Sequence, residues 1–158
     1  MTDDLRQLYQ EVILDHGRKP RNLRAIEGAR TARGHNPMCG DQLTVFVKTG
    51  ADRRIDDIAF VGRGCAISTA SASLMTEVLK GRTEAEARAL FDAFHKLCTG
   101  DDLPDAPEGM EDDLDRLTVL SGVRQFPVRV KCATLAWHTL EAALKGDAEA
   151  TTEGGGDD

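Results

Sequence analysis

Three of the four cysteines lie in short motifs with glycine or basic neighbours, and these motifs carry the strongest chemical signal in the sequence. They are Asn36–Asp41, which contains Cys39; Gly62–Ala66, which contains Cys65; and Arg129–Ala133, which contains Cys132. The motifs are far apart along the chain, so only a folded protein can bring them together. Three soft thiolates and the carboxylate of Asp41 would complete a tetrahedral zinc site. The sequence therefore predicts a metal centre built from Cys39, Asp41, Cys65 and Cys132.

Two simpler interpretations compete with this metal centre. Buried cysteines commonly act as small apolar side chains in a core, and a zinc ion can have a purely structural role. The glycine and aspartate neighbours of the motif cysteines favour a metal or reactive site. Asp41 argues against a closed structural site, because such sites favour Cys and His ligands alone.

The fourth cysteine, Cys98, has a different setting. It follows Phe94 on an apolar helical face, and we predict that it packs in the core. His95 shares that face and could pair with Cys98 as a ligand, but no further ligand converges there.

The local structure predicted around the motifs favours deprotonated thiols. Cys65 is expected where a strand ends and a helix begins, and Cys132 in the first turn of the last helix. Free N–H groups and the macrodipole at a helix N-terminus favour a thiolate. Cys39 and Asp41 stand two residues apart at the entry to a strand, which turns both side chains the same way.

The histidines are weaker candidates for the site. His35 is close to Cys39 in sequence and could support a ligand by a hydrogen bond. His16 ends the first predicted helix, where a cation suits the helix dipole. His138 lies six residues after Cys132, on another face of the helix.

Hydrophobic periodicity predicts the elements that must position these residues. A first amphipathic helix is expected at 4–16, and a basic surface loop at 18–35 leads into the sheet. Strands are expected near 29–36 and around 43–47 and 55–60, the last two as an antiparallel hairpin. Four helices should follow, at 66–80, from a Thr83–Glu86 capping box to about 98, at 114–123 and at 130–145.

This order of elements predicts an α+β fold, in which a small antiparallel sheet of about three strands carries helices on one face. Residues 1–146 should form a single domain. The acidic tail 147–158, which ends in three glycines and two aspartates, is expected to be disordered.

Composition narrows the function class. The chain has 158 residues, enough for a core without disulfide staples, and a net charge of −7, which argues against nucleic acid as a partner. Acids gather at 101–115 and 147–158. The basic segment 17–35 is expected to be a solvated surface, with a protein docking face as the alternative. We expect no membrane span and no secretory signal, and therefore a cytoplasmic protein whose cysteines bind metal or react.

The motifs resemble the SufU branch of the IscU-like family, the zinc-dependent sulfurtransferases of bacterial iron–sulfur cluster assembly. The resemblance rests on Asn36–Asp41, on the Gly-Cys-Ala-Ile-Ser-Thr-Ala-Ser-Ala-Ser run from Gly64, and on Lys131–Trp137. It implies one zinc per chain, held by Cys39, Asp41, Cys65 and Cys132. It also implies that Cys39 accepts persulfide sulfur from a SufS-type, pyridoxal-phosphate-dependent cysteine desulfurase, and that downstream iron–sulfur assembly proteins are further partners.

The alternative within the family is a scaffold on which an iron–sulfur cluster assembles, with iron or a cluster bound transiently. Scaffold members usually carry histidine just before the third cysteine, where this chain has Lys131. SufU members have an insertion between the second and third cysteines, and here 66 residues separate Cys65 from Cys132. Both features favour the sulfurtransferase. One departure is Gly17, where relatives often have an aromatic residue.

Overall fold

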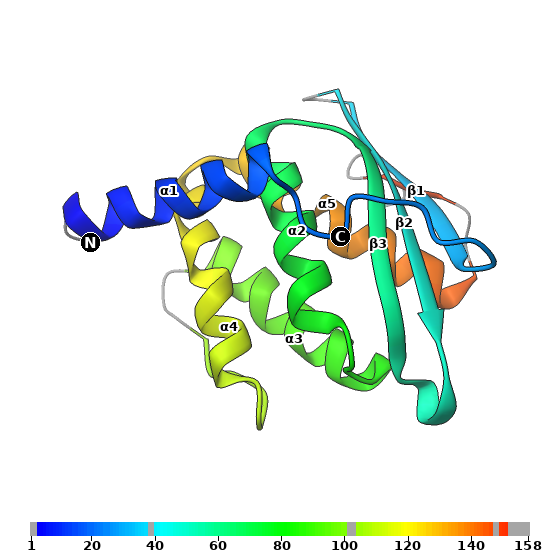
Figure 1. Ribbon diagram of the computed structural model, residues 1–158. Helices are drawn as coiled ribbons and strands as arrows, with labels where there is room; N and C mark the ends of the chain where they lie inside the picture. The colour runs from blue at the N-terminus through cyan, green and yellow to red at the C-terminus, as the bar shows by residue number, and fades with distance from the viewer. Residues whose placement is uncertain (1–2, 38–39, 101–103, 147–148, 152–158) are drawn as a thin grey trace.

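The computed structural model describes residues 3–37, 40–100, 104–146 and 149–151. The helices and strands follow the predicted order (Figure 1). The helices are α1 (Asp3–Arg18), α2 (Ala66–Leu79), α3 (Glu84–Thr99), α4 (Glu111–Leu117) and α5 (Pro127–Lys145), with short 3-10 helices at Ala51–Arg53 and Thr118–Gln125. The strands are β1 (Arg30–Asn36), β2 (Asp41–Thr49), β3 (Ile55–Arg63) and β4 (Glu149–Thr151).

The sheet has four strands in the order β3-β2-β1-β4. β1, β2 and β3 are the three antiparallel strands that the sequence predicted. β4 is short and pairs with β1 in parallel, with Glu149 opposite Arg33 and Thr151 opposite His35. The sequence did not predict this strand, because three residues in an acidic segment carry no periodic signal. The rest of the tail lies outside the described residues, so its disorder stays a prediction.

The helices cover one face of the sheet, which confirms the α+β architecture (Figure 1). Alternate residues of β2, Leu43, Val45 and Val47, are buried on that face. Gly34 of β1 shows how closely α5 approaches, because a Cβ at this position would overlap Thr139 Oγ1. The inner face of the sheet and α5 therefore form one apolar core.

α2 lies at the centre of the helical layer, and small side chains allow its close packing. Ser68, Ala70, Ser71, Ala72 and Ser73 are all buried. The Ser71 hydroxyl donates to the Ala133 carbonyl and accepts from the Trp137 indole N–H, so α2 and α5 are joined by hydrogen bonds inside the core. The polar atoms of this serine are thus satisfied without solvent.

Two helix starts differ from the prediction. α5 begins at Pro127, three residues earlier than expected, because proline is well suited to the first turn of a helix. The helix expected at 114–123 is instead α4 followed by the 3-10 helix Thr118–Gln125. The capping box at Thr83 is present as predicted, with Thr83 and Glu86 exchanging side-chain to backbone hydrogen bonds.

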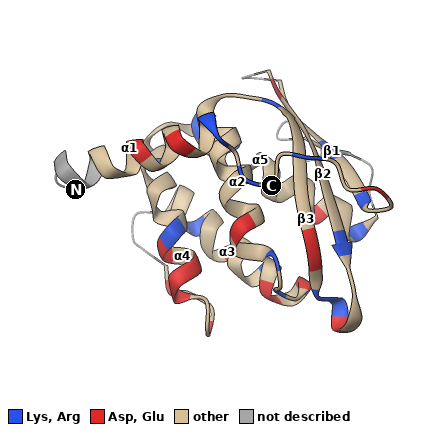
Figure 2. Cartoon of the chain, in the orientation of Figure 1, with Lys and Arg blue, Asp and Glu red and all other residues tan. Residues whose placement is uncertain are grey.

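Ion pairs attach the acidic segment to the helical layer. Figure 2 shows acidic residues gathered on α4. Arg82 binds Asp113 at 2.6 Å and Arg116 binds Glu77 of α2 at 2.6 Å. In the part of the chain that the structure describes, no helix is long and apolar enough to cross a membrane.

Candidate metal centre

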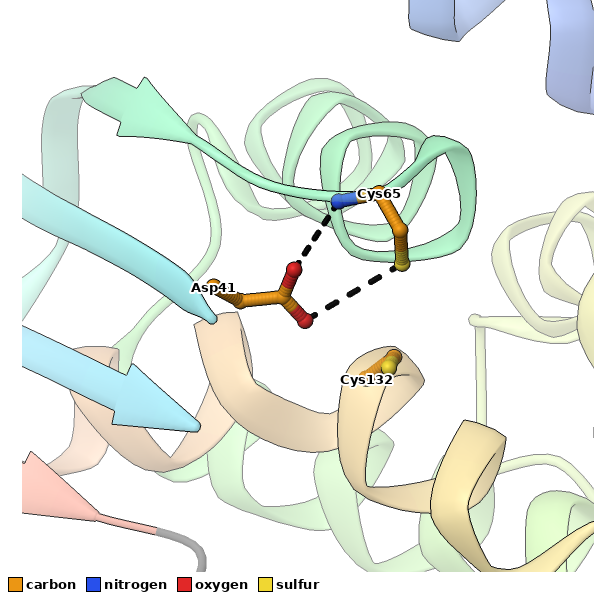
Figure 3. A group of neighbouring side chains, drawn as sticks. All are labelled: Asp41, Cys65 and Cys132. Carbon is orange, nitrogen blue, oxygen red and sulfur yellow. Dashed lines mark hydrogen bonds between the residues drawn. The ribbon is translucent and has the colours of Figure 1, made fainter. Parts of the chain in front are cut away.

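Asp41 is a buried carboxylate at the first position of β2, with no exposed surface. Both of its oxygens face Cys65 (Figure 3). Oδ1 accepts a hydrogen bond from the Cys65 backbone N–H at 2.9 Å, and Oδ2 accepts from the Cys65 thiol at 3.9 Å. Among the residues that the structure describes, no Lys or Arg forms an ion pair with Asp41. A carboxylate buried without a cation is costly, so this position is well suited to a metal ion.

Two glycines allow β3 to deliver Cys65 to Asp41. Gly62 has φ +137°, and a Cβ there would overlap Gln42 O and lie 2.7 Å from Leu43 Cα. A Cβ on Gly64 would overlap Ser68 Oγ and lie 2.9 Å from Asp41 Oδ1. The glycines on either side of Arg63 are therefore needed for the close approach of three chain segments.

Cys65 is the N-cap of α2, as the sequence predicted. Its Sγ accepts a hydrogen bond from the Ser68 N–H at 3.4 Å, and its side chain is partly exposed. The first N–H groups of a helix have no partner within the helix and carry partial positive charge. The Cys65 sulfur therefore accepts from one of the N–H groups at the start of α2 that have no partner within the helix.

Cys132 occupies a different setting from the one predicted. Because α5 starts at Pro127, Cys132 is its sixth residue and lies beyond the first turn, where the dipole effect fades. The polar partner of Cys132 is instead the side-chain amide of Asn36, which donates a hydrogen bond to Cys132 Sγ at 3.5 Å. Cys132 is 1% exposed and Asn36 has no exposed surface, so this contact is shielded from water.

The three side chains converge from the start of β2, the start of α2 and the second turn of α5 (Figure 3). One Asp41 oxygen and the sulfurs of Cys65 and Cys132 all lie within 4.8 Å of one another. Zinc–sulfur bonds of 2.3 Å at tetrahedral angles place sulfur atoms about 3.8 Å apart. The observed spacing therefore fits a metal ion after a small contraction. Cys39, the fourth predicted ligand, lies outside the described residues.

The described residues contain no second group that could form a metal site. Asp41, Cys65 and Cys132 form their only group of three or more potential ligands. Cys98 has no exposed surface, and burial raises the pKa of its thiol to about 12. It stays protonated in the apolar core, as predicted. His95 and His138 instead make edge-to-face contacts with Phe91.

The structure bears on the interpretations of two histidines. His35 is exposed and lies on the outer face of the sheet, one residue from the inward-facing Asn36, so it points away from Asp41, Cys65 and Cys132. Its expected contact with Cys39 lies outside the described residues and stays a prediction. His16 is buried within α1, and its Nδ1 lies 2.7 Å from Ser73 Oγ. Burial lowers the pKa of His16, so its neutral form is favoured and its expected role as a helix-end cation is wrong.

Sequence reasoning missed the role of Asn36. A signal was available, because asparagine is depleted in strands and Asn36 ends a strand whose inward positions otherwise hold only Ala32 and Gly34. An amide at a buried strand position must find a hydrogen-bond partner. What the sequence lacked was the partner, since Cys132 is 96 residues away.

An apolar groove of about 630 Å³ opens beside the ligands, between α1, the 3-10 helix and the start of α5. Ile67, two residues after Cys65, lies in its wall. Leu14 and Phe126 also line it and are 46% and 50% exposed. The Arg129 guanidinium lies 5.1 Å from the centre of the Phe126 ring. The metal centre is thus flanked by an exposed apolar surface with a cationic edge.

Comparison with known proteins decides the family. The model of the NifU-like N-terminal domain matches residues 8–152. The chain belongs to this family. The NifU-like match covers all of the elements from the middle of α1 to β4, including the three ligand motifs.

Relatives of this NifU-like chain carry two kinds of names. An iron–sulfur cluster assembly scaffold protein IscU from Streptococcus pyogenes is 40% identical over 92% of this chain and 88% of its own length. A zinc-dependent sulfurtransferase SufU from Bacillus subtilis is 37% identical over 89% of this chain and 92% of its own length. A crystal structure described as a SUF-system scaffold protein, from Fervidobacterium islandicum, has a TM-score of 0.77 at 33% identity, and the match covers 87% of this chain and 97% of that one.

Proposed function

We propose that this protein is a zinc-dependent sulfurtransferase of iron–sulfur cluster assembly, and that Cys39, Asp41, Cys65 and Cys132 hold one zinc ion. The observation that carries the metal assignment is the convergence of a buried carboxylate with two thiols. The sulfurtransferase assignment is supported by the similarity to a relative of that name.

The donor set fits a functional zinc site better than a closed structural zinc site or a site for an iron–sulfur cluster. Thiolates are the preferred soft ligands for zinc, and bound zinc keeps a coordinating thiol deprotonated. Asp41 is a harder ligand, and such a carboxylate is uncommon in closed structural sites. The residue before Cys132 is Lys131, a cation, at a position where scaffold members of the family usually carry histidine.

In the proposed reaction, Cys39 accepts sulfur from the persulfide of a cysteine desulfurase that uses pyridoxal phosphate. The Cys39 thiolate attacks the terminal sulfur of the donor persulfide and forms a new sulfur–sulfur bond. The donor sulfur–sulfur bond breaks, and its electron pair leaves on the desulfurase cysteine as a thiolate. No external oxidant or reductant is needed, because one sulfur–sulfur bond replaces another.

The described residues prepare this reaction by holding the other ligands in place. Cys65, the N-cap of α2, is fixed by the Ser68 N–H, and Cys132, within α5, is fixed by the Asn36 amide. In the sequence, Cys39 falls between the last residue of β1, Asn36, and the first residue of β2, Asp41, and it precedes Gly40, whose φ is +71°. A thiol that must reach a partner is best placed on a connecting segment, while its neighbours stay anchored.

The apolar groove beside the ligands offers the desulfurase a docking surface. Exposed Phe126 and Leu14 supply apolar area, and Arg129 supplies a cation at the rim. Phe126→Glu should therefore weaken stimulation of the desulfurase while the zinc content stays at one per chain. Val128→Glu changes an exposed apolar residue that does not line the groove, and it is the matched control.

A first experiment measures the metal content of the purified protein and its effect on a desulfurase. The proposal predicts a colourless protein with one zinc per chain that stimulates cysteine turnover, and a Cys39→Ser variant that does not. An unstimulated desulfurase, or equal stimulation by Cys39→Ser, would contradict it.

The second candidate is a cluster scaffold, and the name of the Streptococcus pyogenes relative at 40% identity favours it. In that case iron and sulfide would be bound at the same ligands. A brown protein containing iron and acid-labile sulfide after anaerobic purification would favour the scaffold over the sulfurtransferase.

A further inference from the structure

α1 is anchored to the rest of the protein mainly at His16. Among the α1 residues whose exposure the structure describes, 7–18, His16 is the only buried one. The apolar side chains in this range are half-buried, like Ile13, or exposed, like Leu8 and Leu14 at 53% and 46%. The first turns of α1 extend beyond the helical layer (Figure 1). A helix with so little buried apolar surface is expected to open before the rest of the fold.

Hydrogen bonds at Ser73 of α2 fix which ring nitrogen of His16 carries the proton. The backbone N–H of Arg21 donates to Ser73 Oγ at 2.8 Å, and His16 Nδ1 lies 2.7 Å from the same oxygen. Among the described residues, Ser73 Oγ has no third hydrogen-bond partner, so its own hydrogen goes to Nδ1. Because Nδ1 accepts, neutral His16 carries its proton on Nε2.

A second proton on the His16 ring is incompatible with this arrangement. A protonated imidazole donates from both nitrogens. Nδ1 and the Arg21 N–H would then both donate to Ser73 Oγ, and the hydroxyl hydrogen of Ser73 would lose its acceptor. Ser73 has no exposed surface, and a buried polar group without a partner is costly. Burial of the imidazole acts in the same direction, since it lowers the pKa of His16.

The two acids near His16 are each already paired with an arginine. Arg21 opposes the charged form of His16, Glu77 of α2 and Asp15 favour it, and Arg116 of α4 opposes it. Glu77 Oε1 lies 3.9 Å from His16 Nε2, but the same oxygen binds Arg116 at 2.6 Å. Asp15 binds Arg21 at 2.7 Å. The neighbouring charges therefore do not supply an unpaired anion for a histidine cation.

The second neighbour of α1 is the 3-10 helix Thr118–Gln125. The only charged side chain of this 3-10 helix, Arg124, donates to a backbone carbonyl of α3. The apolar groove lies between α1 and this 3-10 helix, and Tyr9, Ile13 and Leu14 form its α1 wall. The groove is therefore complete only while α1 stays packed against α2.

We propose that neutral His16 holds α1 against α2, and that protonation of Nδ1 releases α1 and removes one wall of the apolar groove. In the released helix His16 is solvated and has its ordinary pKa, about 6.5. The packed state is therefore fully favoured above this pH and is lost progressively as the pH falls below it. This inference depends on neither the metal nor the proposed sulfur transfer.

Amide hydrogen exchange of the full-length protein tests the proposal. After correction for the intrinsic pH dependence of exchange, the opening constant of α1 should rise by up to about tenfold between pH 7.5 and pH 5.5, and that of α3 should not. His16→Gln should remove this rise. His35→Gln, which changes an exposed histidine on the outer face of the sheet, should keep it. No rise in the wild type, an equal rise in His16→Gln, or parallel rises in α1 and α3 would overturn the proposal.

The tautomer of His16 provides a second test that needs no variant. Correlation of the ring nitrogens with the carbon-bound ring protons, in NMR spectra of the ¹⁵N-labelled full-length protein at pH 7.5, shows which nitrogen carries the proton. The proposal predicts a proton on Nε2 and none on Nδ1. A proton on Nδ1 would reverse the hydrogen bond with Ser73 and overturn the proposal.

Discussion

Cys98 and Cys132 are almost equally hidden from solvent, at 0% and 1% exposure, yet their surroundings differ completely. Cys98 lies in an apolar layer of α3, and burial raises its thiol pKa to about 12. Cys132 lies beside the Asn36 amide and within reach of Asp41 and Cys65. The difference shows that two equally buried cysteines can have entirely apolar or polar surroundings. Polar neighbours placed by other elements decide whether a buried sulfur can bind metal.

The largest expected difference separates these two cysteines directly. Cys132→Ser replaces a soft thiolate with a poor zinc ligand and should reduce the zinc content to well below one per chain. Cys98→Ser should keep one zinc, because its side chain touches no ligand. Metal analysis after gel filtration in a weak chelator measures both.

Cys98→Ser should lower the free energy of unfolding and leave the zinc content unchanged. A hydroxyl buried in an apolar core without a full set of partners should lower the free energy of unfolding by about 1–3 kcal/mol. Denaturant unfolding of both variants in the zinc-free state checks this. Zinc loss in Cys98→Ser would contradict the assignment of Cys98 to the core and of Cys132 to the metal site.

A second prediction concerns the amide that makes the Cys132 environment polar. Asn36→Ala should weaken zinc affinity about 10- to 100-fold, the usual effect of losing a hydrogen bond to a metal ligand. His35→Ala changes the neighbouring residue on the opposite face of β1 and is the control. Competition with a chromophoric chelator measures affinity in each protein. Equal zinc affinities in Asn36→Ala and the wild type would show that the Asn36 amide does not support metal binding by Cys132.

A third prediction tests the close approach of β3 to Asp41. Gly64→Ala introduces a Cβ that meets Asp41 Oδ1 at 2.9 Å, so Asp41 or Ser68 must move. We expect a loss of about 1–3 kcal/mol of stability, together with weaker zinc binding. Gly122→Ala is the control, because its Cβ would meet nothing within 4 Å. Thermal unfolding with and without zinc separates the two effects.

The smallest expected effect is a pH dependence at the contact between α1 and α2. Burial lowers the pKa of His16, opposed by Glu77 and Asp15 and reinforced by Arg21 and Arg116. The neutral form is therefore favoured in the folded protein. Its stabilising contribution is complete above the unfolded pKa, about 6.5, and is lost as the pH falls toward the lower folded value.

The measurement is the free energy of unfolding of zinc-free protein between pH 7.5 and pH 5. Wild type should lose more stability over this range than His16→Gln, which keeps a hydrogen-bonding side chain that does not titrate. Parallel pH profiles would show that His16 does not titrate differently in the folded state.

The sequence predicted the elements well because their signals are local. The capping box at Thr83, the alternation in β2 and the apolar face around Phe94 each depend on residues a few positions apart. The ligand residues Asp41, Cys65 and Cys132 could also be selected by type and neighbours. β4 could not be predicted, because it depends on pairing with β1. The start of α5 at Pro127 could not be predicted either, because the hydrophobic periodicity is weak at that boundary.

The environment of each ligand was harder to predict than its identity. The predicted position at a helix start is confirmed for Cys65 and wrong for Cys132, since a shift of three residues in the start of α5 moves Cys132 out of the first turn. The Asn36 contact depends on tertiary packing between β1 and α5. Such long-range polar contacts leave no spacing pattern in the sequence.

The most direct test of the proposed function is to locate the transferred sulfur. Wild-type protein is incubated with a SufS-type cysteine desulfurase and cysteine, alkylated, digested and examined by mass spectrometry. The account predicts a gain of one sulfur atom on the peptide that contains Cys39, and none in Cys39→Ser. Sulfur found mainly on Cys65, Cys98 or Cys132 would contradict the role of Cys39. No added sulfur on any cysteine, with full desulfurase stimulation by Cys39→Ser, would contradict sulfur transfer itself.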